Sequence, residues 1–424
     1  MASTKVSERL SALARTFASR FPERVDGEAT VGREAEFPLV DPAGRAGDAA
    51  RLWPVLLERS GGRPVHDVDG SGRPLLAGVR AERWFCLAEV GRGTLEIGVG
   101  PRACLAELES DLREALECVV PAAASLGYRV LGYGIQPRTP PSRRLLTPKR
   151  RYLSLVEATG SGWLRWTVTA SDQVHVAVGR HQLVRTMNAL NAASGAIIAL
   201  CANSPIYAGR PGAASGREAL SAGVTGERFR NGAVARPCSD LEDYVRTCAR
   251  FRTLFLGSPE TGFTRPDVPF EELLEDRELS FEDFLLHEHY LWPSARPRAR
   301  LGTLEVRPAC QQPKASFAAA ALSLGLVASA NEVLDIADLP WRSLLTYRAE
   351  AVRRAIAAPE PRPRFLRDLV EAAERGLRSR GFGEERYLTE VRERLERRRG
   401  PAAEARWLFE RRGARGIVEA CSLP

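Results

Sequence analysis

Four segments of this chain alternate apolar and charged residues, which is the pattern of a strand with two unlike faces. In VGREAEFPLV, the residues Ala35, Phe37 and Leu39 lie on one face. Glu34 and Glu36 lie on the other, because residues two apart in a strand share a face. Two ionised carboxylates on one face repel each other unless they are solvated or share a cation. The segment therefore predicts a strand with a core-facing side and an acidic side.

The stretch AEVGRGTLEIGVG predicts a β-hairpin of the same design. A two-residue turn at 92–93 would pair Val90 with Leu95. The same register would place Glu89 directly across from Glu96. The two apolar partners would then share one face of the hairpin, and the two carboxylates the other.

Two later segments repeat the pattern. In SDQVHVAV, three valines form the apolar face, and His175 projects from the other face with Gln173. In GTLEVRP, the leucine and the valine are apolar, whereas Glu305 and Arg307 point the opposite way. If all four segments share one antiparallel sheet, their glutamates and the histidine converge on a concave surface.

Such a cluster cannot stay ionised without cations. Its donors are Glu34, Glu36, Glu89, Glu96, His175 and Glu305. Oxygen ligands with at most one histidine favour a hard metal such as Mg²⁺ or Mn²⁺, and Mg²⁺ commonly also binds substrate phosphates. The pattern therefore indicates a nucleotide site. The alternative is that each glutamate lies on a solvated strand face beside an arginine.

The remaining sequence predicts helices around this sheet, in an α+β fold. We expect helices within 1–30, near 52–57, and at 104–127, 181–203, 241–256 and 280–292. We expect strands at 31–41, 84–99, 128–135, 163–179 and 302–308, a Gly/Pro/Asp-rich loop before residue 80 and a long loop at 205–240. After about residue 313 the pattern is helical. We therefore expect a single catalytic domain, 1–424, in which about 315–424 form a helical segment packed on the sheet core.

Composition limits the class of protein. The 424 residues are 44% hydrophobic and 27% charged, as in a globular protein, and no apolar run approaches the roughly 18 residues that span a bilayer. The N-terminus lacks the apolar core of a secretory signal, so we expect a cytoplasmic protein. The eight cysteines have no CxxC spacing and are expected to be free thiols.

The net charge of +8 comes almost entirely from arginine, since only Lys5, Lys149 and Lys314 are lysines. Arginine presents a fork of donors that suits phosphates and carboxylates. The small excess charge and the lack of a nucleic-acid-binding motif predict small-molecule ligands, with no nucleic-acid partner. We expect no membrane partner either, and both a monomer and a homodimer are compatible with the sequence.

Two loops could bind anions. TPKRRY offers Lys149 and Arg151 to phosphates or to a substrate carboxylate. CANSPIYAGRPGAASGRE follows the apolar helix, and either Arg210 or Arg217 could hold a substrate carboxylate. The sequence has no GxxxxGK[ST], no GxGxxG after a strand, no GxSxG, no HExxH and no CxxC pair, which argues against the sites that those motifs build.

In their order and spacing, these motifs resemble the glutamate–cysteine ligase family, in its plant-type and proteobacterial branch, from about residue 30 to the C-terminus. Glu34 and Glu36 resemble the opening E-x-E strand of the family. Glu89 and Glu96 resemble its two hairpin glutamates, and His175 lies in the segment that resembles its central strand. TPKRRY, ANSPIYAGRP, LEVRP and the C-terminal RDLVEAAERGLRSRGFGEERYL resemble further family segments.

The resemblance implies a curved, mainly antiparallel sheet that forms an open cup, as in glutamine-synthetase-like folds, surrounded by helices. It implies an ATP-dependent carboxylate–amine ligase that makes γ-glutamylcysteine from glutamate and cysteine through an acyl phosphate, with two or three Mg²⁺. The implied metal ligands are Glu34, Glu36, Glu89, Glu96, His175 and Glu305. The implied catalytic residues are Glu36, Glu305 and Arg307, the implied ATP contacts are Lys149, Arg151 and Arg307, and the implied acid-substrate contacts are Arg217 and Arg210.

One departure affects the expected substrate. The loop GREALSAGVTG lacks the tryptophan of the family's S-x-x-W stretch. A ligase of specialised metabolism that joins a different amino acid or amine therefore fits equally well. A catalytically silent binding protein on the same fold, and a metal-dependent phosphohydrolase that needs no amine, are further alternatives.

Overall fold

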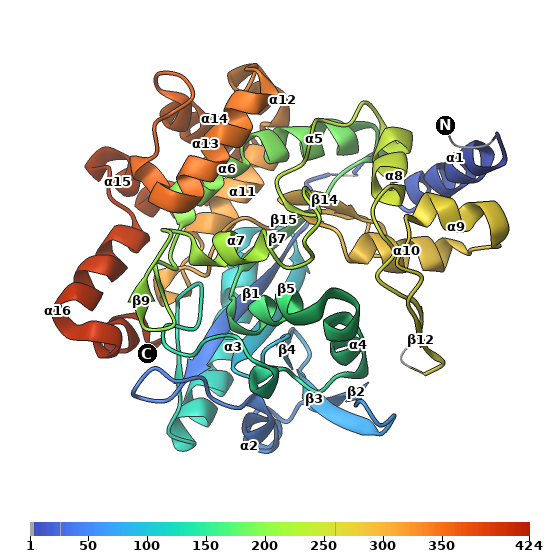
Figure 1. Cartoon of the computed structure of the whole chain (residues 1–424). Coiled ribbons are helices and arrows are strands. Elements are labelled where there is room, and N and C mark those ends of the chain that lie inside the picture. The colour runs from blue at the N-terminus through green and yellow to red at the C-terminus, as the bar shows by residue number, and fades with distance from the viewer. Residues whose placement is uncertain (1–3, 26, 259) are drawn as a thin grey trace.

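A nine-stranded sheet forms the centre of the molecule (Figure 1). The computed structural model describes residues 4–25, 27–258 and 260–424. Eight strands lie in the order β14 (Ala295–Arg298), β15 (Thr303–Val306), β7 (Asp172–Ala177), β1 (Val31–Val40), β5 (Thr94–Arg102), β4 (Trp84–Ala88), β3 (Pro74–Arg80) and β2 (Arg63–Val68). The ninth, β6 (Arg129–Val130), pairs with the end of β1, and every neighbouring pair is antiparallel. The sheet is open at both ends, as expected for the α+β class.

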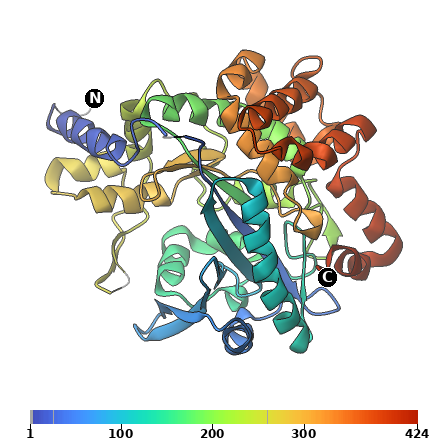
Figure 2. The same cartoon turned by 180° about the vertical axis from the view of Figure 1, so that it is seen from behind.

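Helices surround this sheet on several sides. The first ten are α1 (Thr4–Ala18), α2 (Leu52–Ser60), α3 (Leu105–Ser125), α4 (Arg150–Thr159), α5 (Arg180–Ala192), α6 (Ser194–Cys201), α7 (Gly216–Ser221), α8 (Leu241–Ala249), α9 (Phe270–Asp276) and α10 (Phe281–His289). The others are α11 (Ala318–Ala328), α12 (Ala330–Ile336), α13 (Trp341–Arg354), α14 (Phe365–Ser379), α15 (Thr389–Arg397) and α16 (Pro401–Cys421). Figure 2 shows α3 lying along one face of the sheet, with the C-terminal helices gathered on one side and α1 and its neighbours on the other.

The apolar faces predicted from the alternation pack into the main core. Phe37 of β1 and Val174 of β7 are fully buried, and they belong to one cluster with Leu112 of α3 and Leu324 of α11. Burying apolar surface is the main favourable term in folding, so it fixes which face of each strand points inward. The alternate side chains of the same strands therefore point to the opposite face, where the charged residues lie.

A buried ion pair interrupts this core. Arg33 and Asp172 have fully buried side chains, and Nε of Arg33 donates to Oδ1 of Asp172 over 2.7 Å. Arg33 also donates to the carbonyl of Ser316 over 2.9 Å and stacks on the ring of Phe317. Because a buried charge needs a partner and hydrogen bonds, this pair ties β1 and β7 to the segment that precedes α11.

Two predicted strands are much shorter than expected. Only 172–177 is strand within 163–179, because Gly160–Val168 forms a 3₁₀ helix whose tryptophans pack on Trp292. Only 129–130 is strand within 128–135. The chain there passes so close to residues 310–314 that a Cβ on Gly132 would lie 2.7 Å from the carbonyl oxygen of Gln312. The glycines of this segment therefore serve close backbone packing instead of a ladder.

The predicted hairpin exists, but its register is wrong. Instead of pairing Val90 with Leu95 and Glu89 with Glu96, the structure places Glu96 opposite Leu87. The turn is longer than two residues because its backbone pairs with the loop that precedes α4. A shift of two residues keeps every side chain on its predicted face.

Further differences concern short strands and a helix in segments that were predicted to be loops because they are rich in glycine, proline and charged residues. The expected loop before residue 80 contains the hairpin β2–β3, and the expected loop at 205–240 contains three short strands and α7. The short strands are β8 (Ile206–Tyr207), β9 (Arg210–Pro211) and β10 (Asn231–Gly232), of which β10 pairs in parallel with β13 (Trp292–Pro293). A last hairpin joins β11 (Leu256–Ser258) to β12 (Gly262–Thr264).

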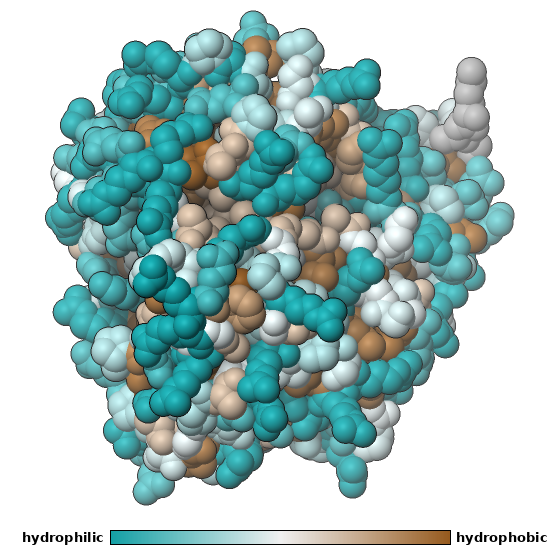
Figure 3. All heavy atoms as spheres, turned by 60° about the vertical axis from the view of Figure 1, so that its left-hand side comes forward, coloured by the Kyte–Doolittle hydropathy of each residue, from teal (hydrophilic) through white to brown (hydrophobic). Residues whose placement is uncertain are grey.

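The surface in Figure 3 is mostly hydrophilic, with apolar side chains scattered over it. Among the described residues, no single helix is long and apolar enough to cross a membrane. The pairs α5–α6 and α11–α12 reach that length and composition only together, and they are bent by 50° and 89°. The eight cysteines are free thiols, as expected.

Acid should destabilise the protein through His287 of α10. Nε2 of this buried imidazole lies 2.9 Å from the carbonyl oxygen of Cys248, and the ring stacks on Phe270. Burial lowers the pKa of His287 from 6.5 to about 3. Below pH 6.5 the unfolded chain therefore binds a proton at this imidazole and the folded chain does not. Each pH unit between 6.5 and about 3 lowers the free energy of unfolding by about 1.4 kcal/mol.

His287→Gln keeps a donor for the Cys248 carbonyl but cannot titrate. Urea denaturation at pH 7.5, 6 and 5 should show wild type losing stability relative to this variant as the pH falls. A difference in unfolding free energy that stays constant over this range would contradict the assignment.

Candidate active site

A cavity of about 250 Å³ opens on the face of the sheet that carries the charged side chains. Most of the residues singled out from the sequence line it, namely Glu34, Glu36, Glu89, Glu96, Arg151, Arg217, Glu305 and Arg307. Strand register brings them together, because Glu36 pairs with Glu96 across β1 and β5. Glu305 pairs with His175 across β15 and β7. Side chains from distant parts of the chain therefore converge as the alternation predicts.

The carboxylates form two groups that could each hold a metal ion. In one, Glu34, His175 and Glu305 offer ligand atoms that lie within 4.8 Å of one another. In the other, the same holds for Glu36, Glu89 and Glu96. We call these the histidine triad and the glutamate triad.

The glutamate triad carries more negative charge than its surroundings balance. Burial and the Glu89 carboxylate raise the pKa of Glu36 to about 7. Burial and the carboxylates of Glu34 and Glu89 raise the pKa of Glu96 well above its ordinary value. Glu36 is held in place by the backbone N–H of Ser171 at 2.7 Å and the side-chain amide of Gln173 at 2.8 Å. Three converging, mutually repelling oxygen donors fit a hard divalent cation.

The histidine triad fits a cation for a different reason. Nε2 of His175 is buried without a hydrogen-bond partner and lies 3.2 Å from Oε1 of Glu34. Nδ1 of the same ring contacts the hydroxyl of Thr303 at 3.2 Å, which orients the imidazole toward the two carboxylates. A buried ring nitrogen that makes no hydrogen bond and lies beside two carboxylates is suited to bind a metal ion with them.

Glu305 differs from the other carboxylates because arginines surround it. Nε of Arg296 lies 2.5 Å and Nε of Arg298 3.6 Å from one carboxylate oxygen, and Arg307 contacts the other. Burial alone would raise the pKa of Glu305, but these guanidinium groups outweigh it and hold that pKa well below its usual range. This carboxylate stays ionised whether or not a metal ion is bound.

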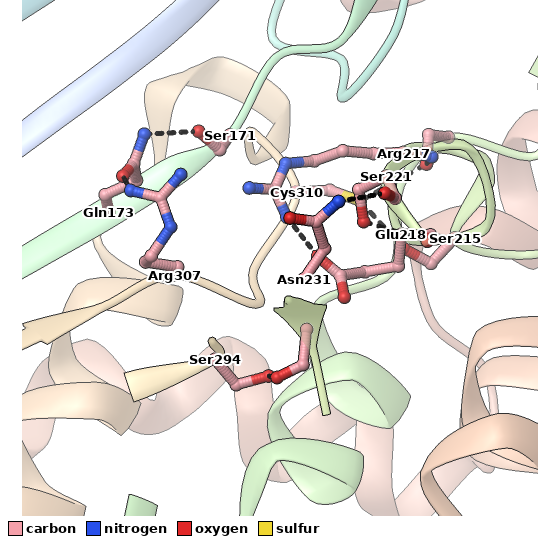
Figure 4. Close-up of polar contacts among 12 residues, drawn as sticks. Ser171, Gln173, Ser215, Arg217, Glu218, Ser221, Asn231, Ser294, Arg307 and Cys310 are labelled. Atoms are coloured by element: carbon pink, nitrogen blue, oxygen red, sulfur yellow. Dashed lines mark hydrogen bonds and ion pairs between the residues drawn. The ribbon is translucent and has the colours of Figure 1, made fainter. Parts of the chain in front are cut away.

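Two arginines reach the cavity from opposite sides (Figure 4). Arg307 leaves β15 and donates to the side-chain oxygen of Gln173. Arg217 lies on α7, is 2% exposed and contacts the carboxylate of Glu218. Fixed cations on both sides of a cavity suit an anionic ligand that bridges them.

The structure places three predicted residues away from the cavity wall. His175 does not line the cavity, but its Nε2 lies 3.2 Å from Oε1 of Glu34, which does. Lys149 donates to the carbonyl of Ala88 at 3.0 Å and lies 3.8 Å from Asp67. Burial and the nearby Arg151 lower the pKa of Lys149 to about 8. Arg210 is exposed on β9, outside the cavity.

An aromatic wall at the cavity was not predicted. It consists of Trp163, Trp166, Tyr290 and Trp292, whose neighbouring ring centroids lie between 5.5 and 6.4 Å apart. Nε1 of Trp163 and of Trp166 is buried without a hydrogen-bond partner. The spacing of WLRW and YLW offered a signal, but in a sequence such residues look like ordinary core.

Comparison with known proteins decides the family. A model of the glutamate–cysteine ligase family 2 matches residues 30–422. The chain belongs to this family. A relative from Rubrobacter xylanophilus, provisionally named glutamate–cysteine ligase 2-3, is 30% identical to this ligase over 307 residues, or 72% of this chain and 70% of its own. A relative from Frankia alni, provisionally named glutamate–cysteine ligase 2-2, is 31% identical over 43% of this chain and 46% of its own.

A solved structure agrees with this fold. The glutamate–cysteine ligase from Francisella tularensis in complex with AMP superposes with a TM-score of 0.53 over 95% of this chain and 88% of its own, at 11% sequence identity. Membership of the family confirms the resemblance of the motifs and makes the protein an ATP-dependent ligase.

Proposed function

We propose that this ligase joins glutamate to cysteine through a γ-glutamyl phosphate, and that it uses ATP with two or three Mg²⁺, for which Mn²⁺ can substitute. The observation that carries the proposal is the convergence of two ligand triads with Arg217 and Arg307 on one cavity. The family and the solved Francisella tularensis enzyme support the reaction type. Coupling a triphosphate to a carboxylate requires many positive charges in one place, and this cavity is built to gather them.

Two of the metal ions would be held by the triads, one in the histidine triad and one in the glutamate triad. When bound, Mg²⁺ supplies the positive charge that offsets repulsion between the triphosphate and the incoming carboxylate. Arg307, oriented by Gln173, donates to phosphoryl oxygens as negative charge develops on them. Arg217 binds a carboxylate of the acid substrate, and Arg151 contacts phosphates. Lys149 does not line the cavity. Its ammonium donates to the Ala88 carbonyl at the end of β4, so it adds positive charge near the phosphates without contacting them directly.

A second candidate is a ligase that joins a different amino acid or amine. The aromatic wall of three indole rings and Tyr290 favours an amine with an apolar side chain. The loop GREALSAGVTG around α7 also lacks the tryptophan of the family's S-x-x-W stretch. The acid substrate can therefore differ from glutamate as well, and the experiment below identifies it.

Mass spectrometry of the products from ATP, Mg²⁺ and a mixture of amino acids tests both candidates. The expected result is γ-glutamylcysteine and ADP in equal amounts. A different amide would support the second candidate. Phosphate release without any amide would indicate a phosphohydrolase, and nucleotide binding without turnover would indicate a binding protein, so either result would overturn the proposal.

A further inference from the structure

Arg348 of α13 links the segments that carry two of the cavity's arginines, Arg217 and Arg307. Its Nη2 contacts Oε2 of Glu218, and the other oxygen of the same carboxylate contacts Nη1 of Arg217. Glu218 is 6% and Arg217 2% exposed. The carboxylate is therefore held between two guanidinium groups, and α13 reaches the cavity through the partly buried Arg348 and the buried Glu218 and Arg217.

The guanidinium of Arg348 is also linked to Arg307, through Ser294. Nη2 of Arg348 lies 3.2 Å from the hydroxyl of Ser294, whose carbonyl accepts a hydrogen bond from the N–H of Arg307 over 2.8 Å. Space around it is tight, since a Cβ on Gly232 would lie 2.6 Å from Nη2 of Arg348. Gly232 has a φ of +72°, so glycine suits this position for two reasons.

We propose that Arg348 and Glu218 are positioning residues that aim Arg217 at the carboxylate of the acid substrate. This inference rests on the proposed function, in which Arg217 binds that carboxylate. A long arginine side chain has many rotamers, and fixing it before the substrate arrives lowers the entropy cost of binding. A buried ion pair often adds little to the stability of a fold. We therefore explain the cluster of Arg217, Glu218 and Arg348 by its effect on the orientation of Arg217.

Steady-state ADP release by the full-length protein tests the proposal, with the acid varied at saturating ATP and then the reverse. Arg348→Ala should raise the KM for the acid by about ten- to a hundredfold and leave the KM for ATP within about twofold. Arg348→Lys, which keeps the charge but loses the fork, should fall between. The matched control is Arg354→Ala on the same helix, where the side chain is 60% exposed, and its kinetics should equal those of wild type.

A double-mutant cycle separates positioning from general damage. If Arg348 acts through Arg217, then Arg217→Ala with Arg348→Ala should have the same KM for the acid as Arg217→Ala alone. Additive effects, or equal changes in kcat and in both KM values, would overturn the proposal. So would an unchanged KM for the acid in a correctly folded Arg348→Ala protein.

The outcome stays separate from that of the proposed function. The acid used in these assays is the one that the product mass spectra identify. If wild type does not use glutamate, only the proposed substrate is wrong, and the positioning of Arg217 is tested with the acid that it does use. An enzyme that activates no acid at all would overturn both.

Discussion

Glu96→Gln is expected to abolish Mg²⁺-dependent ADP formation and, in the metal-free protein, to raise the melting temperature. The substitution removes one ligand of the glutamate triad, and a metal ion that stabilises charge in a transition state contributes several kcal/mol, so turnover should fall at least about a thousandfold. Without metal, the same carboxylate repels Glu36 and Glu89. Removing it should therefore raise the melting temperature by a few degrees.

The sign of the pH dependence follows from the raised pKa values. A carboxyl whose pKa is raised on folding holds its proton in the native state, so stability is lost as the pH rises through the range between the unfolded and folded pKa values. For Glu36 this range runs from 4.5 to about 7, and for Glu96 it also begins at 4.5 and extends upward. The advantage of Glu96→Gln over wild type should therefore be larger at pH 8.5 than at pH 5.5.

Thermal melts in EDTA at those two pH values measure this effect, and a Mg²⁺ titration should raise the melting temperature of wild type more than that of the variant. Glu332→Gln is the control, because Glu332 pairs with Arg375 on the surface. Turnover within tenfold of wild type, or a lower melting temperature of the metal-free variant, would contradict the metal assignment.

The alternation of apolar and charged residues allowed the site to be predicted because a strand has a period of two. Even the wrong register of the β4–β5 hairpin left Glu89 and Glu96 on the predicted face, since the error was two residues. A shift of one residue would have moved Glu96 into the core. The face on which a strand residue lies depends on the alternation within its own segment, so it can be inferred from a single sequence.

The parts of the site that were not predicted depend on contacts between distant segments. Arg296 lies on β14, whose ARPR sequence does not look like a strand, and its role appears only when Glu305 faces it. Arg348 lies on a helix with many other arginines, and nothing in the sequence separates it from Arg353 or Arg354. Lys149 was predicted from a family motif, but the motif gave no sign of the hydrogen bond from its ammonium to the Ala88 carbonyl.

Glu305→Gln is expected to abolish ADP formation as well, but to lower stability. Glu305 is 1% exposed and balances Arg296, Arg298 and Arg307. Removing one partner of a buried ion pair leaves an uncompensated charge and costs about 3–5 kcal/mol. Arg296 is 2% exposed, so water cannot replace the lost partner. Chemical denaturation should therefore show a loss of this size in EDTA, and a larger loss in Mg²⁺ because the variant also lacks a ligand of the histidine triad.

The opposite signs of the two substitutions distinguish a metal site from a polar core. Both variants replace one carboxyl group of the same cavity by an amide, so a general loss of structure would lower the stability of both. If the glutamate triad is built to bind cations, its members destabilise the metal-free fold, whereas Glu305 stabilises it because arginines already neutralise that carboxylate. Equal shifts in the same direction would mean that the two triads do not differ in this way, and the assignment of one ion to each would then fail.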